Sequence, residues 1–489
     1  HYHTLAESNR IALLPEVPQR GRILDRKHRV LAENFPVYTL EITPSKVPDL
    51  ATTIVELSAL VAISASDRQH FYKLREAYHD YESIPIRTHL SDLEVARFSV
   101  NTYRFPGVII KSKLYRHYPY GKLGSHVIGY IGRINDKDRT SLQLRGLASN
   151  YKGSEYIGKA GIEQYYEQNL HGQTGFLQLE TNANGQAVRE MQRVPAIAGH
   201  DIILSLDSYL QEVAERAFGK YRGALVAIQP QSGEILAYVS MPTLDPNLFV
   251  DGIDTDSWLE LNESADKPLI NRPLRGIYPP GSTFKPFVAL AGLHANLRYP
   301  PYAIQDTGHF SLGNNGHRYR DWKPTGHGRV DMQKAITVSC DTFFYGLAQE
   351  LGIKKLSDFV ANFGFGKKTG IDMLGEAQGL LPTPEWKWRR FKQPWYQGET
   401  VITGIGQGYT LVTPLQLAFA TAVLANNGIA VRPHLALQIS DSQTGKPHPL
   451  SPTLQQRLNL NPADLALVRR GMIDVTLAGG TAAGIGQSA

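Results

Sequence analysis

The sequence predicts a multidomain α/β protein, with a β-rich N-terminal region over residues 1–200 and a mixed α/β domain over residues 201–489. A chain of 489 residues is longer than a single hydrophobic core usually serves. Short alternating apolar runs, broken by Pro and Gly, dominate the first 200 residues. Longer helical patterns dominate the remainder, so we place a domain boundary near residue 200.

The composition is that of a folded protein, with 42% apolar and 20% charged residues, and it excludes wholesale disorder. One cysteine excludes an internal disulfide framework and any site built from cysteine alone. Lys and Arg (51) exceed Asp and Glu (45) by six. This mild excess favours anionic neighbours such as glycans or membrane surfaces, and we expect no nucleic acid partner.

The chain shows neither a run of about 18 apolar residues nor a signal peptide. It opens with His1 rather than Met, so we expect the native N-terminus to be missing, which leaves a removed anchor open.

In the N-terminal region, the alternation over residues 37–42 predicts a strand, and residues 51–63 and 91–98 form helical patterns. Residues 101–150 carry nine Lys or Arg against two acids. A solvated face is the favoured interpretation of this segment, and contact with an anionic polymer or membrane is the alternative.

In the C-terminal region, residues 202–206 predict a strand, and Asp207-Ser208 offers an N-cap to a helix over 209–218. Residues 224–229 and 234–240 predict two strands, and the turn signal between them indicates a hairpin. Five further helices are predicted at 282–295, 331–335, 342–351, 414–426 and 462–477.

The sharpest chemical motif is Ser282-Thr283-Phe284-Lys285, which follows a Pro-Pro-Gly break and opens an apolar helix. We expect Ser282 to cap this helix and to share one helical face with Lys285, three residues further on. A serine hydroxyl becomes a strong nucleophile when an adjacent base takes its proton, and a buried lysine can be that base. The motif therefore predicts a nucleophilic Ser282 with Lys285 as its general base.

A second motif, Ser339-Cys340-Asp341, also opens a helix. Ser339 or Asp341 could be a simple N-cap. Alternatively, Ser339 supplies a second hydroxyl that carries a proton to the leaving group, and Asp341 binds a substrate amide or positions Lys285.

Together these motifs resemble those of the penicillin-recognising serine transferases, Ser-x-x-Lys and Ser-x-Asn. Further phrases resemble the class B, monofunctional penicillin-binding proteins, and most closely the penicillin-binding protein 2 branch, the cell-elongation transpeptidases of Gram-negative rods. The phrases are residues 20–26, 118–119, 126–130, 158–163, 223–228, 232–237, 318–322, 403–409 and 413–417.

The resemblance implies an elongated β-rich pedestal carrying a penicillin-binding transpeptidase domain, in which an antiparallel sheet lies between helical layers. It implies a serine D,D-transpeptidase that cross-links peptidoglycan stem peptides through an acyl-enzyme on Ser282 and is inhibited by β-lactams. It also implies a SEDS-type glycosyltransferase and a rod-complex scaffold protein as partners, and an N-terminal membrane anchor, missing here, at the periplasmic face of the inner membrane.

The third family motif, Lys-Thr/Ser-Gly, lacks a convincing match. Lys368-Thr369-Gly370 has the right letters, but the residues around it resemble a surface turn of the family. We expect the working motif beyond Ala489, on a strand that gives the oxyanion hole one N–H, with the N–H of Ser282 as the other.

Two other classes of function remain open. A carboxypeptidase or β-lactamase would use the same Ser282 and Lys285 but would deliver water to the acyl-enzyme. A β-lactam sensor or scaffold would keep the fold without turnover. The 200-residue N-terminal region argues against both, because their usual forms lack it.

A structural zinc site is the last prediction. Cys340 lies within 35 residues of Asp306, Asp321 and His327, and these four side chains are a plausible tetrahedral ligand set. His309 or His317 could replace one of them, and a lone cysteine is often only a small buried apolar residue. The resemblance also implies zinc, since some members of the branch hold one near this motif.

Overall fold

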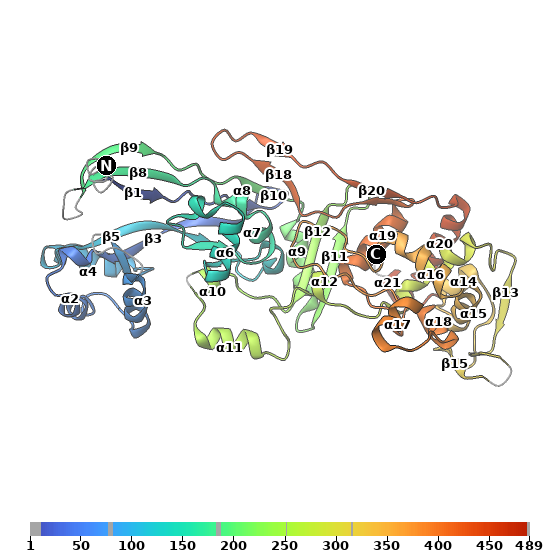
Figure 1. Cartoon of the computed structure of the whole chain (residues 1–489). Helices are drawn as coiled ribbons and strands as arrows, with labels where there is room; N and C mark the ends of the chain where they lie inside the picture. Colours follow the sequence, from blue (N-terminus) through green and yellow to red (C-terminus); the bar gives the residue numbers. More distant parts are fainter. Residues whose placement is uncertain (1–10, 77–81, 182–186, 251, 314–315, 487–489) are drawn as a thin grey trace.

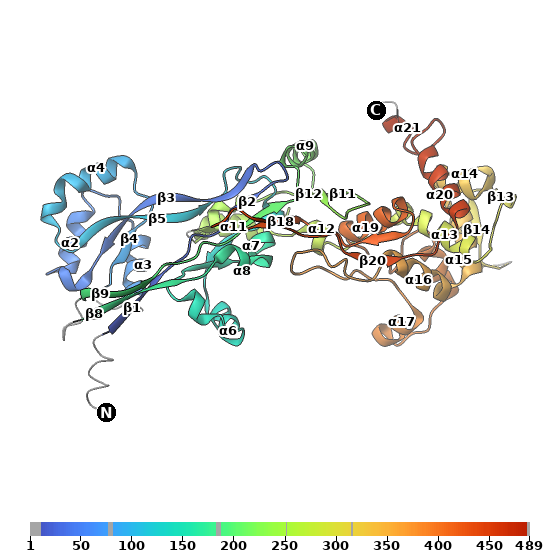
Figure 2. The same cartoon turned by 90° about the horizontal axis from the view of Figure 1, so that it is seen from above.

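The computed structural model describes residues 11–76, 82–181, 187–250, 252–313 and 316–486, and it is elongated (Figure 1). The N-terminal region occupies one end and the C-terminal helices the other, and the view from above keeps this order (Figure 2). Within the described ranges, no helix has the length and apolar character needed to cross a membrane.

The longest pairing in the pedestal joins β3 (Val30–Ile42) to β5 (Val108–His117), antiparallel from Glu33–His117 to Ile42–Val108. Short strands β2 (Ile23–Leu24) and β4 (Ile84–Arg87) extend the sheet. A separate core of apolar side chains lies at this outer end, under the helices α2 (Leu50–Leu57), α3 (Ala65–Arg75) and α4 (Asp92–Asn101).

The helix predicted over 51–63 ends earlier, at Leu57. The Ser58 hydroxyl donates to the Ile54 carbonyl, and the following turn brings Val61 and Ile63 into the core. Burying these two apolar side chains favours the turn over a longer helix, a choice that helical periodicity does not reveal.

Further pedestal elements complete the N-terminal half. A three-stranded antiparallel sheet has the order β1-β8-β9. These strands and the remaining pedestal elements are β1 (Ile11–Glu16), α5 (Ser125–Ile128), β6 (Ile131–Arg133), α6 (Asp136–Leu144), β7 (Tyr156–Gly158), α7 (Gly161–Tyr165), α8 (Glu167–His171), β8 (Gly175–Thr181) and β9 (Ala187–Val194).

The two halves of the chain share one sheet. β10 (Asp201–Leu204) pairs in parallel with β2 and antiparallel with β18 (Ala436–Ser440), which pairs with β19 (Pro447–Pro449). The hairpin β18–β19 thus lies beside the pedestal although it comes late in the sequence (Figure 1). This shared sheet joins the pedestal to the C-terminal half.

Buried ion pairs reinforce the pedestal where it meets this shared sheet. Glu163 is fully buried and accepts from Arg20 Nε and Arg116 Nε at 2.7 and 2.6 Å. Arg20 also reaches Glu167 at 2.6 Å, and Arg116 Nη1 donates to the Gly21 carbonyl. The arginine charges hold the pKa of Glu163 below its usual value against the opposing effect of burial.

Further polar contacts join the two halves of the chain. The His126 Nε2 lies 2.8 Å from the Pro268 carbonyl, and Asn247 exchanges two hydrogen bonds with the backbone of Tyr118. Burial lowers the pKa of His126 to about 4. The imidazole is therefore neutral at pH 7, with the proton on Nε2.

The C-terminal half is built around α13 (Lys285–His294), of whose ten residues nine are buried. The hairpin predicted between residues 224 and 240 is present as the antiparallel pair β11–β12, against which α9, α12 and α19 pack. The helices and strands that complete this half are α9 (Ser208–Phe218), β11 (Gly223–Ile228), β12 (Ile235–Met241), α10 (Asn247–Val250), α11 (Thr255–Glu263), α12 (Arg272–Arg275), β13 (Ala303–Asp306), β14 (His309–Ser311), β15 (Arg318–Arg320), β16 (Gly328–Asp331), α14 (Met332–Thr337), α15 (Asp341–Leu351), α16 (Ile353–Val360), α17 (Pro384–Phe391), α18 (Gln397–Thr403), α19 (Pro414–Ala425), β17 (Ile429–Val431), β20 (Leu454–Arg457), α20 (Pro462–Asp474) and α21 (Ala483–Gly486).

Candidate active site

Ser282 and Lys285 lie at the entrance to the central helix, but Ser282 does not cap it. Residues Gly281–Phe284 form one 3₁₀ turn, and α13 begins only at Lys285, without a side-chain cap. The prediction of a Ser282 cap is therefore wrong. The tighter turn leaves the Ser282 side chain exposed and its hydroxyl free to face another element, whereas Lys285 is 1% exposed.

The partner of Ser282 is Ser339, from the loop between α14 and α15. The Ser339 hydroxyl donates to Ser282 Oγ at 2.9 Å. Lys285 Nζ lies 3.0 Å from the same Ser339 Oγ and 2.8 Å from the Ser339 carbonyl oxygen. Ser339 therefore stands between the serine and the lysine, and among the described contacts no hydrogen bond joins Lys285 directly to Ser282.

Ser339 holds this place through an uncommon backbone conformation, with φ of +53°. A residue with a side chain costs about 1–2 kcal/mol there relative to the right-handed region. The conformation turns both the hydroxyl and the carbonyl of Ser339 towards the same ammonium group. Strain of this kind is found where surrounding contacts fix a functional geometry.

Asp341 completes the surroundings of Lys285. Its Oδ1 accepts from Lys285 Nζ at 2.7 Å, and its Oδ2 accepts from the Trp322 backbone N–H at 3.2 Å. The lysine side chain is 2% exposed and that of Asp341 13%, so this ion pair is largely screened from water. With Ser339 O and Oγ, Asp341 gives the ammonium three acceptors for its three protons.

The arrangement suits acyl transfer by a serine nucleophile. To act as the base, Lys285 must first give up one of its three ammonium protons; the neutral amine can then take a proton from the Ser339 hydroxyl, which in turn accepts the Ser282 proton across 2.9 Å. The same route run backwards delivers a proton to a leaving amine. The residue that the sequence motif alone did not find is Trp322: its indole N–H donates to the Val338 carbonyl, so it braces the Ser339 loop.

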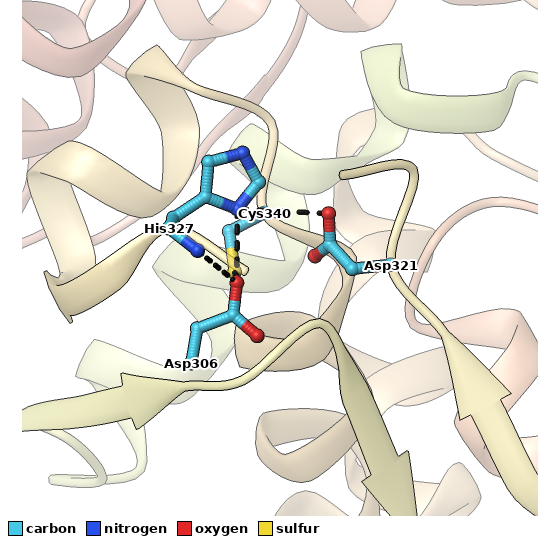
Figure 3. Close-up of side chains that lie close together, drawn as sticks. All are labelled: Asp306, Asp321, His327 and Cys340. Atoms are coloured by element: carbon cyan, nitrogen blue, oxygen red, sulfur yellow. Dashed lines mark hydrogen bonds and ion pairs between the residues drawn. The ribbon is translucent and has the colours of Figure 1, made fainter. Parts of the chain in front are cut away.

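The four predicted metal ligands meet in one place (Figure 3), on β13, the loop after β15, the loop before β16 and the residue preceding α15. One ligand atom from each of Asp306, Asp321, His327 and Cys340 lies within 4.8 Å of the others. His327 Nδ1 is 2.9 Å from Asp306 Oδ2 and 3.6 Å from Asp321 Oδ1. Cys340 Sγ is 3.5 Å from Asp306 Oδ2.

The chemistry of this cluster fits a cation. Asp306 and Asp321 are 2% and 5% exposed, and buried charges are normally paired or bound to metals. His327 directs its Nδ1 towards both carboxylates, whereas its buried Nε2, which has no hydrogen-bond partner in the described chain, lies on the other side of the ring (Figure 3). Burial, with the two carboxylates, raises the pKa of the Cys340 thiol. One nitrogen, one sulfur and carboxylate oxygens form a donor set typical of zinc.

The other candidate residues lie elsewhere. His309 is within hydrogen-bond distance of Arg318, and the His317 ring packs 4.9 Å from that of Tyr319, so neither joins the four-residue cluster. Asp321 also stabilises the start of α15, because its Oδ2 accepts a hydrogen bond from the backbone N–H of Thr342.

Lys368-Thr369-Gly370 lies outside any strand. Both oxygens of Glu376 accept from the N–H groups of Thr369 and Gly370, and Arg432 Nε donates to the Gly370 carbonyl. Among the described hydrogen bonds, none joins this turn to Ser282 or Lys285. It is thus a turn outside any strand, packed through its own partners.

Two family models cover most of the chain: the penicillin-binding protein dimerisation domain matches residues 15–204, and the penicillin binding protein transpeptidase domain matches residues 223–489. The peptidoglycan D,D-transpeptidase MrdA of Escherichia coli K12 is 45% identical over 448 residues, which is 92% of this chain and 70% of the relative.

Solved structures agree with these family matches. Pseudomonas aeruginosa PBP2 in complex with WCK 5153 is 39% identical, with a TM-score of 0.74 over 98% of this chain and 84% of the other. Helicobacter pylori PBP2 in its complex with MreC is 30% identical, with a TM-score of 0.80 over 96% and 86%. The chain therefore belongs to the class B penicillin-binding proteins, in the MrdA or PBP2 branch of peptidoglycan D,D-transpeptidases.

Proposed function

We propose that this chain cross-links peptidoglycan stem peptides during cell elongation, through an acyl-enzyme on Ser282. The observation that carries the proposal is the continuous contact from Ser282 Oγ through Ser339 Oγ to Lys285 Nζ, at 2.9 and 3.0 Å. It connects an exposed serine to a buried lysine through one hydroxyl, the arrangement that general-base activation of a serine nucleophile requires. The chain that carries this arrangement belongs to a family of D,D-transpeptidases.

In the first half of the reaction, Ser282 Oγ attacks the carbonyl carbon of the penultimate D-Ala of a donor stem peptide. Its proton passes to Ser339, and the Ser339 proton passes to Lys285. When the tetrahedral intermediate collapses, the C–N bond breaks and the terminal D-Ala takes a proton back along the same route. The donor is then held as an ester on Ser282.

In the second half, the amine of an acceptor stem peptide attacks the ester carbonyl and gives up a proton through Ser339 to Lys285. Ser282 Oγ leaves and is reprotonated, so an amide cross-link forms and the enzyme returns to its starting state. Asp341 stabilises the lysine whenever it is charged, and Trp322 holds Asp341 by its backbone N–H.

Acylation by penicillin tests this proposal in the full-length protein. The intact mass should rise by one penicillin, and peptide mapping should place the adduct on Ser282. Ser282→Ala should abolish the adduct, and Lys285→Ala should slow its formation by about 10²–10⁴-fold. An adduct that persists in Ser282→Ala refutes the assignment of the nucleophile.

We further propose that Asp306, Asp321, His327 and Cys340 hold a structural zinc ion. With four protein ligands, such an ion would stabilise the fold rather than act as a Lewis acid. Cys340 lies between Ser339 and Asp341, so a firmly held Cys340 keeps both neighbours in place around Lys285.

Elemental analysis of protein purified without a His-tag should give about one zinc per chain. Cys340→Ala should lose the zinc and lower the melting temperature. His309→Ala is the matched control, because His309 lies outside the cluster, and it should keep both. A wild type that is free of metal and equally stable in the presence of a chelator contradicts the proposal.

The partners are proposed from the family. A rod-complex scaffold protein is supported by the Helicobacter pylori relative, which was solved with MreC. A SEDS-type glycosyltransferase would supply the glycan strands, and an N-terminal membrane anchor would hold the pedestal at the periplasmic face of the inner membrane. Co-purification of the full-length protein with each proposed partner, before and after deletion of the anchor, tests these partners and the role of the anchor.

A further inference from the structure

An exposed surface of aromatic and basic side chains lies on α17 and the segment that follows it. Trp388, Phe391 and Tyr396 are 57%, 44% and 54% exposed, and Arg390 and Lys392 are exposed among them. Trp388 and Phe391 stand at positions i and i+3 of α17 and so share one helical face, and Lys392 follows the helix as its C-cap, in a left-handed conformation. We call these five residues the α17 surface.

The packing of α17 presents this face outwards. Lys387 is 1% exposed, forms an ion pair with Glu399, and lies 4.2 Å from the centre of the Tyr396 ring. On the inner side, the Trp386 ring packs 5.1 Å from that of Tyr409. These contacts fix the helix, so the exposed side chains project from a rigid support.

A purely structural role, without any ligand, explains only part of this surface. Basic residues near the C-terminus of a helix are favoured by the helix dipole, which accounts for Arg390 and Lys392. It does not account for Trp388, which is 57% exposed, nor for the 44% of Phe391 that stays exposed although its ring packs on those of Trp386 and Tyr409. Exposed aromatic side chains gathered on one face are typical of a binding surface.

The α17 surface is connected to the nucleophile by a short path. Tyr409 lies in the loop between α18 and α19, and the Gly406 carbonyl in this loop accepts from the Gly281 N–H at 2.9 Å. Gly281 precedes Ser282. The Phe391 ring lies 5.7 Å from that of Tyr409. The α17 surface and the residue before the nucleophile are therefore in contact with the same loop.

Charge indicates the chemistry of the occupant. The one acid of α17, Glu385, lies four residues before Arg389, the spacing of a stabilising pair. Within the described chain, Arg390 and Lys392 form no ion pair with any carboxylate, so both charges are available to an anionic ligand. Sugar rings present apolar C–H faces that bury well against aromatic rings, and carboxylates pair with guanidinium and ammonium groups.

We propose that the α17 surface binds the glycan strand of peptidoglycan, with its aromatic rings on the sugars and with Arg390 and Lys392 on stem-peptide carboxylates. This inference rests on the proposed function and extends it from the reacting peptide to the polymer that carries it. A membrane is the competing occupant. However, α17 lies in the C-terminal half of the long axis, away from β1, the strand nearest the proposed anchor (Figure 1).

Equilibrium binding of the full-length protein in micelles to soluble, un-cross-linked peptidoglycan strands tests this inference. The double variant Trp388→Ala/Phe391→Ala should weaken strand binding by about tenfold or more. Arg390→Gln/Lys392→Gln should weaken it less at high salt than at low salt, because exposed charges are screened. The matched control is Trp258→Ala, an exposed tryptophan on α11, which should bind as the wild type does.

Two further measurements separate the possible failures. Penicillin acylation at Ser282 should be unchanged in both double variants, because the small ligand does not reach the α17 surface. A wild type that penicillin does not acylate would refute the proposed function rather than the glycan inference. Strand binding that is equal in wild type and both double variants overturns the glycan inference. Vesicles of phosphatidylglycerol that bind the wild type but not the variants, with strands bound equally, would assign the surface to membrane.

Discussion

Removing the Ser339 hydroxyl is the sharpest test of the proton route. This hydroxyl is the one described group that touches both Ser282 Oγ, at 2.9 Å, and Lys285 Nζ, at 3.0 Å. Positioned proton transfer is worth about 10²–10⁴-fold, or about 3–5 kcal/mol of barrier. We therefore expect Ser339→Ala to slow penicillin acylation by that factor, measured as the second-order rate constant with a fluorescent penicillin.

A second variant separates catalysis from folding. Ser339 has φ of +53°, a conformation that glycine adopts without strain, so Ser339→Gly removes the hydroxyl and relieves about 1–2 kcal/mol. It should acylate as slowly as Ser339→Ala while melting at a higher temperature than the alanine variant. Thr283→Val is the matched control, because the Thr283 hydroxyl donates to the Pro280 carbonyl and should be dispensable for acylation. Wild-type rates in both Ser339 variants would refute the relay and make Lys285 the direct base.

The remaining predictions concern stability. Glu163→Gln should lower the free energy of unfolding by about 3–5 kcal/mol, because it leaves two buried arginines short of their carboxylate; a loss below 1 kcal/mol in urea titration would contradict this. Burial holds the pKa of His126 at about 4, below the usual 6.5, so the unfolded chain binds the proton first as pH falls. The contribution of His126 to the free energy of unfolding is complete above pH 6.5 and falls by about 3 kcal/mol between pH 6.5 and 4. An equal dependence of the unfolding free energy on pH in wild type and His126→Gln would contradict this. Asp341→Ala should cost about 3 kcal/mol because the buried Lys285 ammonium loses its carboxylate, whereas Asp341→Asn keeps an acceptor and should cost less by thermal melting.

Several features followed from local sequence alone. The spacing of Ser282 and Lys285 placed both near the start of one helix, and the alternating runs on either side of residue 232 indicated the β11–β12 hairpin. These features depend on neighbours within a few residues, where backbone sterics and side-chain period decide the outcome. The mistaken Ser282 cap is also instructive: both a cap and a 3₁₀ turn satisfy the same local pattern.

Other features required the folded chain. Ser339 reaches Ser282 across 57 residues, and the hairpin β18–β19 joins a sheet begun by β2. Neither periodicity nor turn chemistry encodes such distant pairings. The contact between Ser339 and Ser282 arises because α13, α14 and α15 bury their apolar faces together, which brings the loop between α14 and α15 onto the start of α13.

The sequence by itself therefore determined which side chains could act: a serine with a lysine three residues on, a second serine, and one cysteine with aspartate and histidine nearby. Only the tertiary structure decided how they act together. It placed Ser339 between nucleophile and base, gathered four potential ligands from separate elements within 4.8 Å, and left the α17 aromatics in solvent. Composition and spacing carry the chemistry of each group, whereas the distances between groups are set by how the whole core packs.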